Sequence, residues 1–287
     1  MVKTKDVASE FIGIEIDQNF TKQRIELHQS KHIQDAVDRF ALKDAKAVTI
    51  PIDTACLKDF NSELLKDAKH YQSLVGTLNY ICSSTRPDIC FAVNHLATKA
   101  KAPSVADLRR AKRCLVYLRE TKHLRLRYKT CDEKLSLTMY VDASYASGKE
   151  RRSIYGFVIF LNKAVIHYKT KQQAIITLSS TEAEFVALVL GVKELKWMMN
   201  LIEEIGFKVD LGIVYRDNQG ALKIIKNEGS TARTKHVDVR LQYLKQQVSN
   251  GNIEPRYVNT KDQIADIFTK PLGRLNFERL KSFMLQA

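Results

Sequence analysis

The sequence predicts an α/β protein (α+β overall), in which a mostly helical first half with a β-hairpin precedes a mixed five-stranded sheet with flanking helices. The composition supports this, because 45% of the 287 residues are hydrophobic and 27% charged, which is typical of a globular chain. The apolar periodicity also changes from helical to strand-like near "YKTCDEKLS" at 128–136. Length and periodicity together predict two domains, 1–130 and 135–287.

A β-hairpin opens the first domain. In "FIGIEIDQNFTKQRIELHQ" (11–29), apolar and polar residues alternate on both sides of a polar turn. "SKHIQDAVDRFAL" (30–42) then has helical spacing, with Ser30 as the expected N-cap. Three further helices are expected, at about 66–82, 88–100 and 104–121, and a capping box from Ser104 to Asp107 opens the last of them.

The second domain begins with strands and then alternates helices with strands. This order of elements predicts a sheet that mixes antiparallel and parallel pairs and has helices packed on it. The expected strands are "LSLTMYVDA", "YGFVIFL", "AVIHYKT", "LGIVYRD" and "IEPRYV". The expected helices are about 180–205, "NQGALKIIKN", "HVDVRLQYLKQQVSN" and a final turn or more in "KDQIADIFTK".

The charge is strongly positive, with 46 Lys and Arg against 32 Asp and Glu and a net charge of +14. Such an excess favours a polyanionic partner, most often nucleic acid. From Lys99 to Lys129 there are 11 Lys and Arg against two acids, and Arg109, Arg110 and Arg113 lie off the apolar stripe of their helix. We expect these arginines to contact phosphate; the alternative is an ordinary solvated face.

The five cysteines are odd in number and form no C-x-x-C pair, which indicates reduced, intracellular usage rather than zinc ligation or disulfides. No run of about 18 apolar residues predicts a membrane span. The N-terminal "MVKTKDVASEF" lacks the apolar core of a signal peptide. We therefore expect no membrane partner and an intracellular location, in the cytoplasm, a virus-like particle or the nucleus.

Four carboxylates lie where this order of elements can bring them together. Asp142 ends the first strand of the second domain, Asp217 ends the fourth, Glu184 lies in the first turns of the long helix, and Asp266 lies near the start of the last helix. Strand ends of α/β sheets border the crevice in which ligands bind. Four gathered acids need a cation, and carboxylate oxygens suit Mg²⁺. A pair of such ions can hydrolyse a phosphodiester.

Each acid also has a purely structural explanation. Asp142 could form a turn, Asp217 could cap the helix after it, Asp266 could be a surface residue, and Glu184 could be the acid of a capping box with Thr181. For one acid alone the structural explanation is preferred. For four acids in this order of elements the metal site is preferred.

Several segments resemble one family. "YVDASYA", "LSSTEAEFVAL", "RDNQGAL", "TKHVDVR" and "DQIADIFTKPL" are similar to the ribonuclease H domain of a copia-type retrotransposon Pol polyprotein. "FIGIEID", "YQSLVGTLNYICSSTRPDICFAVNHL" and "RRAKRCLVYLRETK" resemble the end of its reverse transcriptase, just upstream. The family's polymerase motif, Tyr-x-Asp-Asp, does not occur in this sequence. The resemblance thus implies a thumb-like reverse transcriptase remnant that does not polymerise, followed by a ribonuclease H domain of a C-terminal fragment.

The resemblance implies that Asp142, Glu184, Asp217 and Asp266 are both the catalytic residues and the ligands of two Mg²⁺ ions, for which Mn²⁺ can substitute. Glu184 is chosen because "EFVA" has the expected two larger residues and a small one after the acid. Glu182 remains the alternative, since residues two apart on a helix point in different directions.

Other polar residues are candidates for nucleic-acid contact. Ser180 lies at a helix N-terminus that could hold phosphate, and Asn218 and Gln219 could reach a minor groove. Arg233, Lys235 and His236 lie in "RTKHVD", where His236 could protonate a leaving group, contact phosphate or cap the helix.

The function predicted from these observations is cleavage of the RNA strand of an RNA–DNA hybrid, with the hybrid and other Pol subunits as partners. Cleavage would leave a 5′-phosphate and a 3′-hydroxyl, as the family implies, and recognition would use the 2′-hydroxyls in the wide minor groove. One alternative is a catalytically silent nucleic-acid-binding remnant of a retrotransposon. Another is an integrase-type nuclease, which the flanking copia-type segments disfavour.

Overall fold

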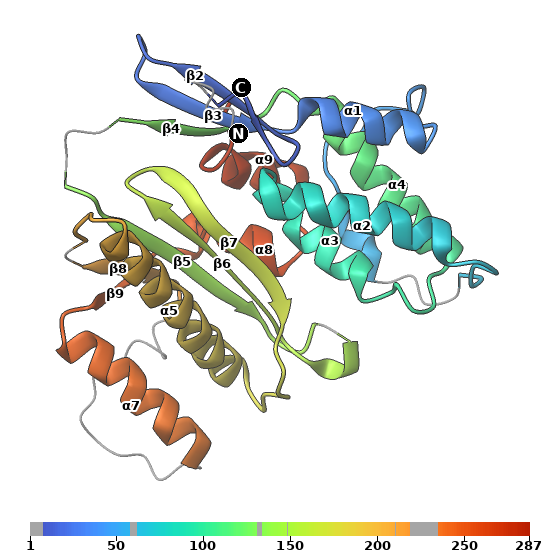
Figure 1. The fold of residues 1–287 in the computed structure, drawn as a ribbon. Helices are drawn as coiled ribbons and strands as arrows, with labels where there is room; N and C mark the ends of the chain where they lie inside the picture. Colours follow the sequence, from blue (N-terminus) through green and yellow to red (C-terminus); the bar gives the residue numbers. More distant parts are fainter. Residues whose placement is uncertain (1–7, 58–61, 131–133, 148, 210, 219–234) are drawn as a thin grey trace, which may run out of the picture. The chain divides into compact units, whose positions relative to one another are not determined.

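The computed structural model describes residues 8–57, 62–130, 134–147, 149–209, 211–218 and 235–287, with side chains omitted for 56, 57, 149 and 235–238. The chain divides into two compact units (Figure 1). Unit 1 comprises Met1–Thr130 and Pro271–Ala287, and unit 2 comprises Cys131–Lys270. The segment from Pro271 onward therefore differs from the sequence prediction, which assigned it to the second domain.

Unit 1 combines an antiparallel sheet with a group of helices. Its sheet has the order β1-β2-β3-β4, with β1 at Glu10–Phe11, β2 at Ile14–Asn19, β3 at Arg24–His28 and β4 at Leu126–Lys129. Its helices are α1 (Ser30–Arg39), η1 (Thr54–Leu57), α2 (Lys69–Ser84), η2 (Pro87–Ile89), α3 (Cys90–Ala97), α4 (Val105–Glu120) and α9 (Arg274–Ser282). The expected hairpin is β2–β3, and the expected helices are α1 to α4.

Three local details of unit 1 extend or correct the prediction. The capping box of Ser104 and Asp107 is present at the start of α4. Ser30, expected to be an N-cap, is instead the first residue of α1, and its hydroxyl donates to the Lys122 carbonyl (2.8 Å). β4 and α9 were not predicted, because a four-residue strand and a polar nine-residue helix depend on partners that are distant in sequence. In α9, for example, the ring centroids of Phe277 and Tyr117 lie 5.7 Å apart.

A buried ion pair lies at the centre of unit 1. Arg86 donates to both carboxylate oxygens of Asp88, at 2.9 and 2.7 Å, and both side chains are almost completely buried. The Tyr117 hydroxyl of α4 donates to the same carboxylate at 2.5 Å, and Arg86 also donates to the carbonyl and the hydroxyl of Thr121. The Arg86 guanidinium and the Tyr117 hydroxyl hold the pKa of Asp88 below its usual value despite burial, so this carboxylate stays ionised.

Unit 2 contains the predicted mixed five-stranded sheet, with the order β7-β6-β5-β8-β9. The strands are β5 (Leu137–Ser144), β6 (Ile154–Leu161), β7 (Ala164–Gln172), β8 (Gly212–Arg216) and β9 (Ile253–Tyr257). β6 pairs antiparallel with β5 and β7, whereas β8 pairs parallel with β5 and β9. Parallel neighbours end at the same edge of a sheet, so the carboxyl ends of β5 and β8 lie together.

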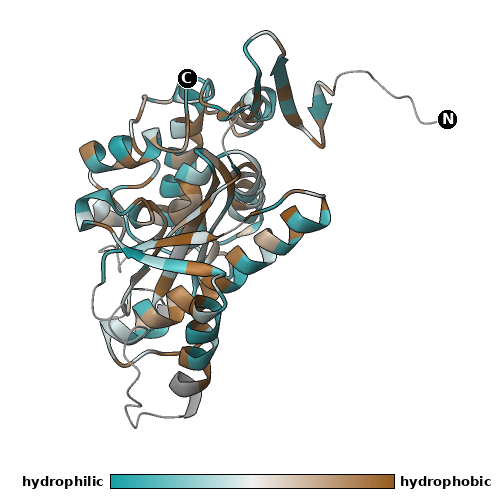
Figure 2. Cartoon of the chain, turned by 90° about the vertical axis from the view of Figure 1, so that its left-hand side faces the viewer, coloured by the Kyte–Doolittle hydropathy of each residue, from teal (hydrophilic) through white to brown (hydrophobic). Residues whose placement is uncertain are grey.

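Helices flank this sheet. The remaining elements of unit 2 are η3 (Lys149–Arg151), α5 (Ser180–Glu204), α7 (Lys235–Ser249), η4 (Thr260–Asp262) and α8 (Asp266–Thr269). Figure 1 shows α5 running along β5 and β6, and its inward side chains share one apolar core with those strands. In Figure 2, hydrophobic and hydrophilic residues alternate along both the helices and the strands. The expected helix "NQGALKIIKN" falls almost wholly outside the described residues.

One glycine determines how closely α8 approaches the sheet. A Cβ atom at Gly156 of β6 would lie 2.3 Å from the Cβ of Phe268 in α8. Gly156 pairs with Asp142 across the β5–β6 ladder. Phe268 also accepts a hydrogen bond from the Thr170 hydroxyl of β7 through its carbonyl, at 2.9 Å. The bare backbone at Gly156 therefore lets α8 pack directly over the strand that faces Asp142.

Two further sequence predictions can be compared with the structure. Cys82, Cys90 and Cys114 are buried, and the Sγ atoms of Cys82 and Cys90 lie 3.0 Å apart. Across the described ranges, no helix is both long enough and apolar enough to cross a membrane.

The buried ion pair generates the first test. Arg86→Met leaves the Asp88 carboxylate buried without its cation, and we expect this to cost about 3–5 kcal/mol of stability. Tyr117→Phe removes only one donor to that carboxylate, and we expect about 1–3 kcal/mol. Urea unfolding followed by circular dichroism measures both. Arg109→Met, which removes an exposed arginine, is the matched control; a destabilisation as large as that of Arg86→Met would contradict a special role for the buried pair.

Candidate active site

The site is built around Asp142, near the end of the central strand β5. Asp142 is 3% exposed. Its carboxylate accepts a hydrogen bond from the hydroxyl of Thr269 in α8. The segment before α8 is attached to the same strand, because the buried Gln263 donates to the Val141 carbonyl at 3.1 Å. The close approach of α8 thus brings its polar residues to Asp142.

Glu182 and Glu184 at the start of α5 have different roles. The Ser179 hydroxyl caps the helix by accepting from the backbone N–H of Glu182 at 3.1 Å. The Glu182 carboxylate turns back and accepts from the backbone N–H of Leu178 at 2.7 Å. Glu184 lies further into the helix and is largely buried, with 12% of its side chain exposed. The capping acid is therefore Glu182, and Glu184 is the acid that points toward Asp142.

Asp142, Glu184 and Asp217 form the core of the site. Each offers a carboxylate oxygen, and these oxygens all lie within 4.8 Å of one another. The acids come from β5, from α5 and from the residue that follows β8, which are distant in sequence. Hard oxygen ligands at this spacing, largely shielded from water, fit Mg²⁺ or Mn²⁺.

Asp266, the first residue of α8, is not part of this group of three. Its carboxylate pairs with Lys270 at 2.9 Å, one helical turn later. The same ammonium lies 3.9 Å from the Asp142 carboxylate. Lys270 thus lies between the fourth predicted acid and the group of three. Lys270 and Thr269 were missed by the sequence reasoning, although an acid and a lysine at i and i+4 are a recognisable signal for an ion pair.

Arg216 is a further residue that sequence reasoning missed. It is the last residue of β8 and is 1% exposed, and its Nη2 donates to Glu184 at 3.1 Å. The sequence signal was its position directly before Asp217. The structure thus adds two cations, Arg216 and Lys270, to the predicted acids.

The electrostatics show an excess of acid. Burial and the Asp142 carboxylate raise the pKa of Glu184 to about 8, although Arg216 acts in the opposite direction. Burial and Asp142 also raise the pKa of Asp266 to about 7, against the effect of Lys270. Burial lowers the pKa of Arg216, while the surrounding carboxylates raise it. Burial is the largest influence on all three groups, and the nearby Asp142 carboxylate adds to the raised pKa of Glu184 and of Asp266. An excess of carboxylates in a poorly solvated place favours the uptake of a proton or of a metal ion.

The predicted nucleic-acid contacts are dispersed. Ser180 is exposed at the start of α5, and Asn218 is half-buried next to Asp217. Gln219 and Arg233 lie outside the described residues. Lys235 and His236 lie in the first turn of α7, and their side chains are not among those described. Only Ser180 and Asn218 can therefore be placed on the elements that carry the acids.

The three predicted arginines of α4 line one hollow in unit 1. The hollow measures about 430 Å³, and Arg109, Arg110 and Arg113 line it together with Asp53 and two alanines. Arg109 is exposed, whereas Arg110 pairs with Asp107 at 3.3 Å and Arg113 donates to the Ile50 carbonyl at 3.3 Å. The three arginines therefore line the same hollow. Arg110 and Arg113 are also held by other residues of unit 1, Asp107 and Ile50.

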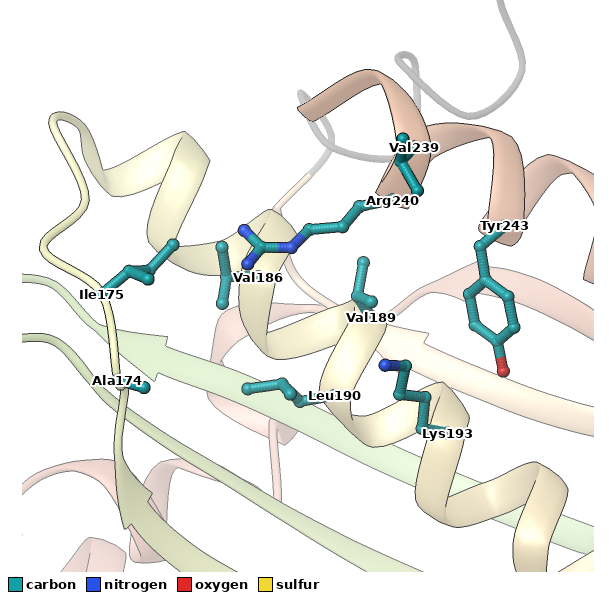
Figure 3. A pocket seen from close by; sticks show the side chains of 9 residues that line it. All are labelled: Ala174, Ile175, Val186, Val189, Leu190, Lys193, Val239, Arg240 and Tyr243. Atoms are coloured by element: carbon teal, nitrogen blue, oxygen red, sulfur yellow. The ribbon is translucent and has the colours of Figure 1, made fainter. Parts of the chain in front are cut away.

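Unit 2 has a second hollow, of about 290 Å³, between α5, α7 and the loop after β7. Figure 3 shows mostly apolar walls, with Val186 and Val189 on α5 and the side chains of Lys193 and Arg240 reaching across. None of the four acids lines it. This hollow is therefore separate from the carboxylate site.

The chain is similar in sequence to curated proteins from plant transposons. No protein-family model matches the chain. It is 33% identical over 284 residues to the retrovirus-related Pol polyprotein from transposon RE1 of Arabidopsis thaliana, which covers 98% of this chain and 19% of the relative. It is 30% identical over 285 residues to the one from transposon TNT 1-94 of Nicotiana tabacum, covering 96% and 21%. The chain thus spans about a fifth of the length of these curated relatives.

A solved ribonuclease H domain from Mycobacterium tuberculosis matches 52% of this chain and 98% of its own chain, at 12% identity and a TM-score of 0.35. A TM-score this low supports no inference about fold or function. The sequence relatives, by contrast, extend across almost the entire chain. The chain therefore belongs to the retrovirus-related Pol polyproteins of copia-type transposons.

Proposed function

We propose that unit 2 is a ribonuclease H that cuts the RNA strand of an RNA–DNA hybrid with two divalent metal ions. The observation that carries the proposal is the group of three carboxylates, Asp142, Glu184 and Asp217, whose oxygens lie within 4.8 Å of one another. Family membership supports it, because a Pol polyprotein of a retrotransposon handles RNA–DNA hybrids when its RNA is copied into DNA.

In this proposal Asp142 is the central ligand, because it faces Glu184 and Asp217 on one side and α8 on the other. Asp266 would be a fourth ligand if its carboxylate held a metal ion in place of its present partner, Lys270. The bound ions would supply the Lewis acidity that activates an attacking water and stabilises the leaving oxygen. Thr269 orients the Asp142 carboxylate by donating to one of its oxygens, which leaves the other oxygen for the ligand role.

The hybrid would be held through its phosphates and 2′-hydroxyls. Ser180 and Asn218 lie beside the acids, and Gln219, Arg233, Lys235 and His236 belong to the adjoining sequence. The arginines of α4 would add phosphate contacts that do not depend on base sequence. Cleavage and binding should therefore be separable by substitution.

The first test removes a ligand. Asp142→Asn should reduce hybrid cleavage by on the order of 10³-fold, because an amide is a poor ligand for Mg²⁺, while hybrid affinity without metal is not weakened. Cleavage of end-labelled RNA and fluorescence anisotropy measure the two properties.

Glu182→Gln is the matched control for Glu184→Gln. Glu182→Gln should keep cleavage and lose some thermal stability, whereas Glu184→Gln should lose cleavage. Parent chain that binds hybrid and leaves its RNA intact with Mg²⁺ and with Mn²⁺ would favour a catalytically silent binding protein.

The second test uses pH. The folded-state pKa of Glu184, about 8, lies above its ordinary value of 4.5, so the folded protein holds a proton that the unfolded chain releases. Stability in EDTA should therefore fall as the pH rises from about 5 to about 8. Glu184→Gln should flatten this fall, and saturating Mg²⁺ should flatten it in the parent. Melting temperature against pH is the measurement, and an equally steep fall in Glu184→Gln would contradict the assignment.

The third test concerns the arginines of α4. Replacing Arg109, Arg110 and Arg113 by alanine should weaken hybrid binding and lower the slope of log K against log salt by about 0.9 for each phosphate that is no longer neutralised. Because Arg110 and Arg113 also contact unit 1, Arg109→Ala alone is the cleaner variant. Lys43→Ala, an exposed change elsewhere in unit 1, is the control. A salt slope equal to that of the parent would mean that these arginines form only a solvated face.

A further inference from the structure

Arg216 is unusual among the buried side chains of unit 2. It is 1% exposed, and its Nη2 donates to Glu184 at 3.1 Å. Within the described part of the chain, its Nε and Nη1 are buried and have no hydrogen-bond partner. Buried guanidinium groups are normally hydrogen-bonded on several sides, as Arg86 is in unit 1. A group that is buried and so incompletely satisfied needs another source of stabilisation.

That source is the charge around it. The carboxylates of Glu184, Asp217 and Asp142 each act on Arg216 in the direction that keeps it charged. The three acids lie within 4.8 Å of one another, so without a cation their mutual repulsion is severe. Arg216 is the one described cation that is both buried and paired with a member of the group of three. Without Arg216, the three carboxylates would need a cation from solution to balance their charge.

We propose that Arg216 is a resident cation of the carboxylate site and opposes the binding of divalent metal there. This inference rests on the proposed function, since it concerns the same metal site. Arg216 Nη2 donates to one oxygen of Glu184 at 3.1 Å, so a metal ion that binds the other oxygen of Glu184 would lie close to the guanidinium charge. The positive charge of Arg216 also repels an incoming cation at short range, where screening by water is weak.

The proposal has two consequences. The chain should remain folded without metal, because Arg216 offsets part of the repulsion between the acids. It should also bind divalent metal more weakly than the same carboxylates would without the guanidinium. Arg216 is in this sense a specificity-determining residue for the cation, and it sets the metal concentration at which the site fills.

The experiment compares neutral and charged replacements in the full chain. Arg216→Gln removes the charge and keeps an N–H donor for Glu184, whereas Arg216→Lys keeps the charge. Mn²⁺ binding is measured by electron paramagnetic resonance of the free ion, at a pH above the pKa of Glu184. Arg216→Gln should bind Mn²⁺ roughly tenfold more tightly than the parent or better, and Arg216→Lys should stay within about threefold. Arg256→Gln, at an exposed position of β9, removes the same charge outside the site and should also stay within about threefold.

Thermal unfolding is the second measurement. Arg216→Gln should melt lower than the parent in EDTA and gain more from Mg²⁺, because the metal then replaces the missing cation. Arg216→Met is a second neutral variant, chosen because its straight side chain fills similar space. If both neutral variants stay unfolded even with saturating Mg²⁺, Arg216 is a structural residue and the inference is wrong.

The remaining outcomes separate the inference from the proposed function. If the parent binds Mn²⁺ and Arg216→Gln binds it no more tightly, the resident-cation inference fails and the metal site stands. If Arg216→Gln and Arg216→Lys both bind more tightly, the charge is not the cause and the inference fails again. If neither the parent nor any variant binds Mn²⁺, the metal site and the inference fail together.

Discussion

The repulsion between carboxylates at the ends of β5 and β8 is the constraint on which the rest of unit 2 depends. Parallel pairing of these strands brings Asp142 and Asp217 to one edge of the sheet, and the capped start of α5 adds Glu184. Such a group is unstable unless protons or cations balance it. Three features reduce this repulsion in part: the raised pKa of Glu184, the ion pair of Glu184 with Arg216, and the ammonium of Lys270 near Asp142.

The buried ion pairs of the two units differ in how completely they are hydrogen-bonded. In unit 1, Asp88 receives two hydrogen bonds from Arg86 and one from Tyr117, so this ion pair is well satisfied and serves stability. In unit 2, Arg216 has one hydrogen-bond partner among the described residues and Glu184 retains a raised pKa, so the charges are incompletely balanced. Incomplete balance is costly for stability, and it is what a site needs if it is to accept a further cation.

The proposed ribonuclease H activity and the net charge of +14 are consistent with each other. A polyanionic substrate is attracted by the basic surface as a whole, whereas the acids form a small buried group that repels phosphate until metal neutralises it. Metal uptake would therefore precede productive binding of the scissile phosphate. A resident guanidinium that sets the metal requirement would act on this step.

The sequence by itself predicted the five strands of unit 2 and the helices α5 and α7, because alternating and helical periodicities are local properties of the chain. It also located Asp142 near the end of β5, Asp217 at the end of β8, Glu184 in the first turns of α5 and Asp266 at the start of α8, since strand ends and helix starts can be read from periodicity and capping residues. Only the tertiary structure separated Glu184 from Glu182, because that choice depends on which way the start of α5 faces the sheet. It also decided that Arg216 is buried among the acids and that α9 packs with unit 1, since both result from contacts between residues far apart in sequence.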